Sequence, residues 1–179
     1  RGRDGPHQSA TLRSDAMNSC RNPQFALRLD AGQPDPAQVW HDGATLDYLG
    51  GKLRLLLGTE QRDAMRSGDT LSLPLPPRAS PRQIQDRAEA WLRDEAMRRL
   101  QQVIEEKSAL AGRRAPRLAL SFAARGHWVE APGDGSLRCN WRLIQQPPAA
   151  IEQAIARGIA ALPPEQAGFD LFGMPTATG

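Results

Sequence analysis

Histidine and cysteine side chains hold most catalytic metals and many nucleophilic sites, and this chain has few of them. The three histidines are His7, His41 and His127. No two of them are four residues apart, so no helix can present a histidine pair to one metal ion. The two cysteines, Cys20 and Cys139, share no short spacing and form neither a zinc knuckle nor a redox motif. We expect reduced thiols, with Cys139 buried in a strand.

Serine and phosphate chemistry find no better support in the sequence. Ser121 and Ser136 lie in no nucleophile elbow, the strand-to-helix turn that exposes a catalytic serine. The run Gly133-Asp134-Gly135-Ser136 is too short and isolated for a phosphate-binding loop, whereas Asp-Gly is a common hairpin turn. We therefore expect a turn at this point.

The charge pattern argues against a nucleic-acid or membrane partner. The 179 residues include 23 basic and 20 acidic side chains, giving a formal net charge of +3. Acids and bases are mixed along residues 82–107, which is typical of a solvated helix surface, whereas phosphate binding favours one sign of charge. No apolar run has the length that a bilayer span needs. We expect a cytoplasmic protein.

The first half of the chain shows the two-residue period of β-strands. Alternating apolar and polar side chains predict strands over residues 25–30 and 69–76. A hairpin is predicted over residues 45–58, with its turn at Gly50-Gly51. Pro74 favours an edge position or a strand end.

After these strands, residues 81–111 show the apolar spacing of an α-helix. Ser80 is a plausible N-cap with Pro81 in the first helical position, and the pattern continues to about Ala111. Apolar residues at spacings of three and four form one stripe: Ile84, Ala88, Trp91, Leu92, Leu100, Val103 and Ile104.

The last third of the chain predicts two more strands and a shorter helix. The strands span residues 117–124 and 137–143, with Asp134-Gly135 as a hairpin turn between them. The helix spans about 150–162 and ends at Pro163 and Pro164. The order of elements predicts an α+β fold, with helices packed on a largely antiparallel sheet.

Residues 125–162 resemble the YgjP-like family of small zinc metallopeptidases, relatives of the SprT-like proteases and minimal gluzincins. The run Asn140-Trp141-Arg142-Leu143, followed by Pro147-Pro148, is the specific part of the likeness. Trp128 takes the place of a family tryptophan and Gly135 that of a turn glycine. With looser likeness upstream, the resemblance covers about residues 22–172. It implies a metallopeptidase-like domain over 22–172, with a C-terminal tail at 173–179 and a flexible tail or expression remnant at 1–21.

The resemblance makes the helix over residues 150–162 the zincin-type helix, which holds H-E-x-x-H in the family. In this chain Arg157 takes the place of the first histidine, Gly158 that of the catalytic glutamate and Ala161 that of the second histidine. The family's third ligand corresponds to residues 166–173, where there is no histidine. The resemblance therefore implies a degenerate member with no catalytic residue and no metal site, in which Arg157, Gly158 and Ala161 are vestigial site positions.

Two questions stay open on the sequence. Arg157 either points to water or fills the vacated metal position and pairs with a carboxylate such as Glu130. Trp128, Asn140 and Trp141 either pack in the core or line a candidate groove in which an extended peptide binds by strand addition.

Two classes of function follow. The first is a non-catalytic metallopeptidase-like domain, a pseudoenzyme without a cofactor, that binds an unknown protein or peptide or has a structural role. The alternative is a metal-dependent hydrolase or peptidase that uses a relocated site. Nucleic-acid binding is a weaker third class, which a steep fall of affinity with salt would reveal.

Overall fold

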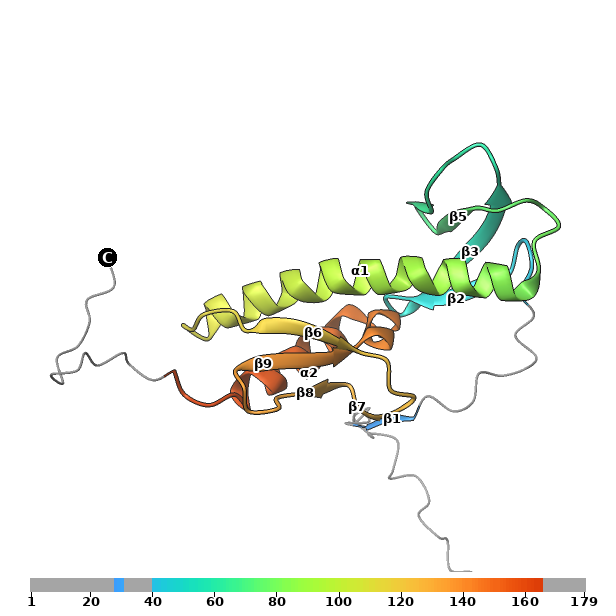
Figure 1. Ribbon diagram of the computed structural model, residues 1–179. Helices are drawn as coiled ribbons and strands as arrows, with labels where there is room; N and C mark the ends of the chain where they lie inside the picture. Colours follow the sequence, from blue (N-terminus) through green and yellow to red (C-terminus); the bar gives the residue numbers. More distant parts are fainter. Residues whose placement is uncertain (1–27, 31–39, 166–179) are drawn as a thin grey trace, which may run out of the picture.

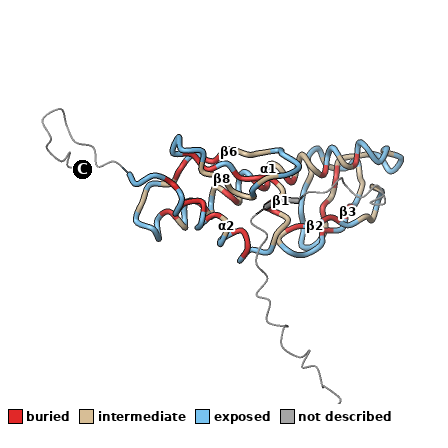
Figure 2. Tube along the Cα trace, turned by 90° about the horizontal axis from the view of Figure 1, so that it is seen from below, coloured by how far each residue is buried: buried red, intermediate tan, exposed pale blue. Residues whose placement is uncertain are grey.

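A computed structural model describes residues 28–30 and 40–165 (Figure 1). A long helix, α1 (Pro81–Leu110), lies across two sheets, and a shorter helix, α2 (Pro148–Ala160), packs against α1 and the second sheet. The fold is α+β, and most strand pairs in the described residues are antiparallel, as predicted. Buried residues concentrate where the helices face the strands (Figure 2).

Helix α1 begins where the sequence predicts. The Ser80 hydroxyl accepts a hydrogen bond from the Gln83 amide, and the Gln83 side chain accepts one from the Ser80 amide, which completes a capping box. One face of α1 is at most 1% exposed along its length: Ile84, Ala88, Leu92, Ala96, Leu100 and Ile104. This spacing of four residues places these side chains on one face of the helix, and α1 packs against α2 and strands of both sheets.

The first sheet contains β2 (Thr45–Tyr48), β3 (Gly51–Gly58), β4 (Met65–Ser67) and β5 (Thr70–Pro74), in the order β2-β3-β5-β4. The predicted hairpin is confirmed, but its turn is at Leu49 and Gly50, one residue before the predicted Gly50-Gly51, with φ angles of +48° and +76°. A Cβ on Gly50 would lie 3.0 Å from Pro147, so glycine is needed both for the turn and for the approach of the segment before α2.

The second sheet contains β6 (Arg117–Ser121), β8 (Val129–Glu130) and β9 (Ser136–Asn140), in the order β6-β9-β8. Here the predicted hairpin between the strands at 117–124 and 137–143 is wrong. β6 and β9 are parallel, and β8 is the antiparallel hairpin partner of β9. Parallel neighbours need a connection of a dozen or more residues, and the segment between β6 and β9 supplies it.

Two short elements complete the second half. Trp141–Gln145 forms a 3₁₀ helix, η1, where the sequence predicted the end of a strand. Asn140 causes the change, because its side-chain oxygen accepts a hydrogen bond from the Arg142 amide at 3.0 Å and caps η1. A two-stranded ladder joins β1 (Arg28–Asp30) to β7 (Arg125–His127).

Helix α2 matches the predicted helix to within two residues at each end. Ile151, Ile155 and Ile159 are buried on the face that meets α1 and the sheet, and Pro163 follows its last turn. The predicted strand over 25–30 is described only from Arg28 to Asp30. The first half of that prediction and the predicted packing of residues 169–172 lie outside the described residues.

Candidate functional site

The three vestigial positions, two on α2 and one at its C-cap, have different surroundings. Arg157 and Ala161 are exposed, whereas Gly158 is buried. No ion pair joins Arg157 to Glu130, so of the two alternatives for Arg157 the structure shows the solvent-facing one. At the positions that the resemblance assigns to two histidines, α2 and its C-cap residue therefore present a guanidinium and a methyl group to water.

Gly158 lies against the second sheet at the closest approach of α2 to β8. A Cβ built on Gly158 would lie 2.5 Å from Cγ1 of Val129 and 3.1 Å from Cδ2 of Leu137. Carbon atoms in van der Waals contact are about 3.5–4.0 Å apart. Val129 is β-branched and stiff, so it moves aside only at a cost. The position assigned to the catalytic glutamate therefore has no room for any side chain while Val129 keeps its place.

Two of the three candidate groove residues are used by the fold. The Asn140 side chain is buried, donates to the Ala123 carbonyl at 2.8 Å and caps η1. The Trp141 ring is 3% exposed, with the guanidinium groups of Arg93 and Arg142 at 5.3 and 4.7 Å from its centroid. These cation–π contacts cover the ring and leave little of it for a ligand.

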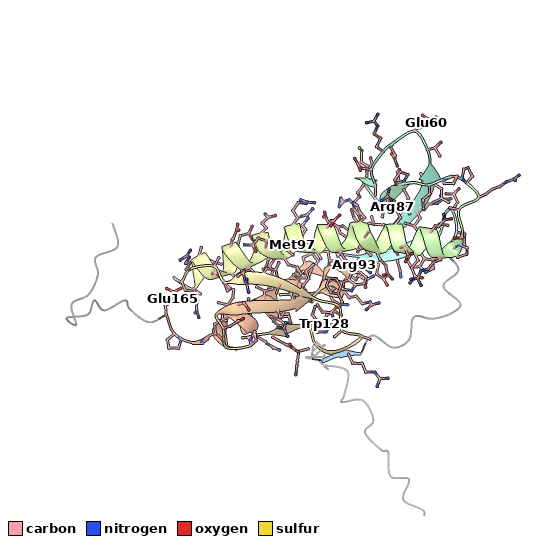
Figure 3. The ribbon with its side chains drawn as sticks, viewed as in Figure 1. Glu60, Arg87, Arg93, Met97, Trp128 and Glu165 are labelled. Atoms are coloured by element: carbon pink, nitrogen blue, oxygen red, sulfur yellow. The ribbon has the colours of Figure 1, made fainter. Side chains whose placement is uncertain are left out.

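Trp128 is the groove residue that remains half-exposed. Its carbonyl accepts a hydrogen bond from the Asn140 amide at 2.8 Å, which ties the backbone to β9. Its side chain lies beside β8 at one end of the second sheet, and Glu165 lies at the other end (Figure 3). Of the three residues, Trp128 is the one placed to contact a chain lying along β8.

Other metal and nucleophile candidates are not brought together. In residues 28–30 and 40–165 no three histidine, cysteine, aspartate or glutamate side chains are grouped so that they could hold a metal ion. His41 is exposed in the loop before β2, and His127 is on β7. Cys139 is fully buried, as predicted, and burial raises the pKa of its thiol to about 12. It is therefore unreactive at neutral pH.

A polar cluster lies between α1 and the first sheet, and no pattern in the sequence predicts it. Tyr48 donates a hydrogen bond to Glu95 at 2.5 Å, and Arg98 and Arg99 also donate to this buried carboxylate. Burial alone raises the pKa of Glu95, but the hydrogen bonds from Tyr48, Arg98 and Arg99 outweigh it and lower the pKa below its ordinary value. The cluster joins α1 to β2 and has the character of a structural link.

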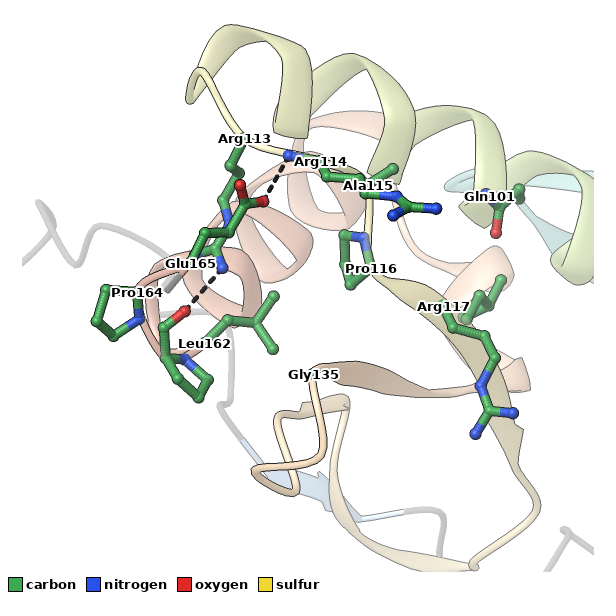
Figure 4. Close-up of a pocket in the computed structure, with 12 residues that line it drawn as sticks. Gln101, Arg113, Arg114, Ala115, Pro116, Arg117, Gly135, Leu162, Pro164 and Glu165 are labelled. Atoms are coloured by element: carbon green, nitrogen blue, oxygen red, sulfur yellow. Dashed lines mark hydrogen bonds between the residues drawn. The ribbon is translucent and has the colours of Figure 1, made fainter. Parts of the chain in front are cut away.

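A cavity of about 620 Å³ lies where α1, β6 and the end of α2 meet (Figure 4). Arg113 donates to the carbonyls of Ile159 and Pro163 at 3.1 and 2.8 Å, so its charge serves the C-terminal end of α2. Glu165 accepts a hydrogen bond from the Arg114 amide at 2.7 Å. With one carboxylate and no histidine or cysteine in its lining, this cavity has no metal-binding set.

One comparison with known proteins gives a clear result. A model of the family described as "YgjP-like, metallopeptidase domain" matches residues 25–156, well over half of the chain. The chain belongs to this YgjP-like family. No curated protein and no solved structure matches it.

The YgjP-like match includes both sheets, α1, η1 and the first turns of α2, and it ends one residue before Arg157. The correspondence at Arg157, Gly158 and Ala161 therefore comes from the resemblance in sequence described above. No described helix of this YgjP-like domain has the length and apolar character needed to cross a membrane.

Proposed function

We propose that this YgjP-like domain is a non-catalytic member of its family, and that it binds an extended peptide at the edge of its second sheet. The non-catalytic role follows from the zinc ligands and catalytic base that the site lacks, and the peptide binding follows from the exposed edge of β8. The contact between Gly158 and Val129 carries the proposal.

That contact supports the loss of the family's chemistry. A zincin needs two histidines to hold the metal and a glutamate beside the first to take a proton from metal-bound water. Here the two histidine positions are Arg157 and Ala161, both exposed, and a guanidinium keeps its positive charge at any working pH. At Gly158, Val129 occupies the space that the carboxylate side chain would need. Ligands and base are replaced together, which favours loss of the reaction.

A relocated site finds no support in the described residues. A catalytic zinc takes three protein ligands and an open position. His41 lies in the loop before β2 and His127 on β7, and no carboxylate completes a set with either of them in the described part of the chain. The alternative of a hydrolase with a relocated site therefore has no observation in its favour.

The edge at β8 provides the binding surface. β8 is the last strand of the β6-β9-β8 sheet, so in the described residues the side of β8 away from β9 has no partner strand. An extended chain adds to such an edge through backbone hydrogen bonds and needs no chemistry. Trp128 precedes β8 and is half-exposed, so it supplies an aromatic contact to a chain lying there.

The experiment is a screen of the full chain against immobilised extended peptides, with zinc present, followed by mass spectrometry of each bound peptide. We expect binding without cleavage. The best peptide is then made in two forms, N-methylated at alternate residues, because only one set of amides faces β8. One form should keep its affinity and the other should lose at least tenfold. Cleavage of the peptide contradicts the non-catalytic role, and equal loss in both forms contradicts strand addition.

A further inference from the structure

Three arginines gather around the cavity between α1, β6 and the end of α2. Arg113 and Arg114 follow α1, and Arg117 is the first residue of β6. Among the described residues that line the cavity, Glu165 carries the only carboxylate, so positive charge is in excess. The volume of about 620 Å³ is within the range of small-molecule sites. The cavity therefore has the size and the charge to hold a small anion.

The fold already uses the charge of Arg113. Its two terminal nitrogens donate to the carbonyls of Ile159 and Pro163 at 3.1 and 2.8 Å, at the C-terminal end of α2. Glu165 also has a structural contact, because its carboxylate accepts a hydrogen bond from the Arg114 backbone amide at 2.7 Å. These contacts fix one wall of the cavity.

The guanidinium groups of Arg114 and Arg117 have no ion-pair partner within residues 28–30 and 40–165. Both residues are exposed and line the cavity. Arg117 attracts the Asp134 carboxylate, but the hydrogen bonds to this carboxylate come from the Ser136 amide and hydroxyl. Two guanidinium groups are therefore available to an anion that enters the cavity.

The rest of the lining is largely apolar. It comes from the segment between α1 and β6, from β6 and from the segment after α2: Ala115, Pro116, Leu118, Leu162, Pro163 and Pro164. In Figure 4 the guanidinium groups of Arg114 and Arg117 lie to the right of Pro116, and Leu162 lies to its left. A ligand with a charged group at one end and an apolar body at the other matches this division of the lining.

We propose that this cavity binds a small organic anion, whose charged group contacts Arg114 and Arg117 and whose apolar body lies against Leu118 and Leu162. A carboxylate suits the two arginines, because a guanidinium can donate two parallel hydrogen bonds to it. A free organic acid and the C-terminal residue of a peptide share this chemistry. The site does not depend on the proposed function, since β6 and β8 are opposite edges of the second sheet.

A pair of fluorescent probes tests the need for a negative charge. Anilinonaphthalene sulfonate is an aromatic anion, and phenylnaphthylamine is the same molecule without the sulfonate. In titrations of the full chain, we expect the anion to bind at one saturable site. Arg114→Gln combined with Arg117→Gln should weaken its binding about tenfold or more, as expected for lost charged hydrogen bonds, and should leave the affinity for the neutral probe unchanged. Equal affinity of the unmodified chain for the two probes would overturn the proposal.

Arg87→Gln is the matched control. Arg87 is an exposed arginine of α1 that forms no ion pair with a described residue, and Figure 3 shows it far along α1 from Glu165. This variant should bind both probes as the unmodified chain does. The Arg114 variant keeps the backbone amide that Glu165 accepts from, so urea unfolding should show an unchanged fold. Equal weakening of the anion by Arg87→Gln would overturn the proposal.

Competition with the bound sulfonate identifies the source of the carboxylate. Octanoate represents a free organic acid, with octanol as its neutral control. A short peptide that ends in leucine represents a chain end, with its C-terminal amide as the control. Displacement by octanoate or by the free-acid peptide, but not by the matching neutral control, supports the site, and the stronger competitor identifies the source. Displacement by neither acid, or equal displacement by the neutral controls, would overturn the proposal.

Discussion

Gly158→Ala is expected to destabilise the domain, although the same change stabilises an ordinary helix. In a solvent-exposed helix interior, alanine is better than glycine by about 1 kcal/mol. Here the new Cβ would lie 2.5 Å from Cγ1 of Val129 and 3.1 Å from Cδ2 of Leu137. Forcing an extra carbon into a packed interior costs about 1–3 kcal/mol, and the first contact is short enough for the upper end. The net loss in the free energy of unfolding is about 2 kcal/mol.

Urea unfolding followed by circular dichroism measures the change. Ala156→Gly is the matched control, since Ala156 is exposed in the interior of the same helix, and should cost about 1 kcal/mol. Val129→Ala removes the Cγ1 atom that the new Cβ would meet. The double variant should therefore lose less stability than the two single variants lose together, by about 1 kcal/mol or more. A Gly158→Ala protein that gains stability would refute the close contact and the argument built on it.

Three further predictions concern other parts of the fold. Glu95→Gln should lower the free energy of unfolding by about 2 kcal/mol at neutral pH, as expected for lost charged hydrogen bonds. Folding lowers the pKa of Glu95, so the stabilisation that its carboxylate provides is complete above its ordinary pKa of 4.5 and is lost as the pH falls through the folded value. In urea unfolding, the stabilities of the two proteins should therefore converge in acid. A difference that stays constant with pH would contradict this. Cys139→Ser should not change the number of thiols that a thiol reagent labels in the folded protein at pH 8, and it should remove one labelled thiol in denaturant. The reason is that burial raises the pKa of Cys139 to about 12. Labelling of Cys139 that is faster in the folded protein than in denaturant would be inconsistent with its burial. Gly50→Ala should lower the free energy of unfolding by about 1–2 kcal/mol in the same urea assay, since its φ is +76° and Pro147 lies 3.0 Å from the new Cβ. Gly51→Ala, whose new Cβ would make only an ordinary contact at 3.6 Å, should cost less. The reverse order would contradict the account of the turn.

Local signals in the sequence were enough for most elements. Ser80, Pro81 and the apolar spacing of four fix the start and the buried face of α1, and the alternation around Gly50 fixes the first hairpin. These features depend on neighbours in sequence. The pairing of β6 with β9 depends on a return of the chain through β7 and β8, and an Asp-Gly turn does not say which strand it joins.

The candidate site was predictable in its positions and not in its contacts. Arg157, Gly158 and Ala161 follow from the register of the resemblance. Nothing local explained a glycine in mid-helix, and its reason is Val129, which is far from it in sequence. Trp141 and Asn140 were ambiguous between core and groove, because a tryptophan or asparagine on a strand looks the same in either place. The contacts with Arg93 and Ala123 resolve the question only in three dimensions.

A zinc titration of the full, chelator-treated chain by calorimetry tests the central claim most directly. The account predicts no stoichiometric zinc binding, because α2 and its C-cap offer Arg157, Gly158 and Ala161 in place of two ligands and a base. A single tightly bound zinc per chain, together with peptide cleavage that stops when the metal is removed, would contradict it.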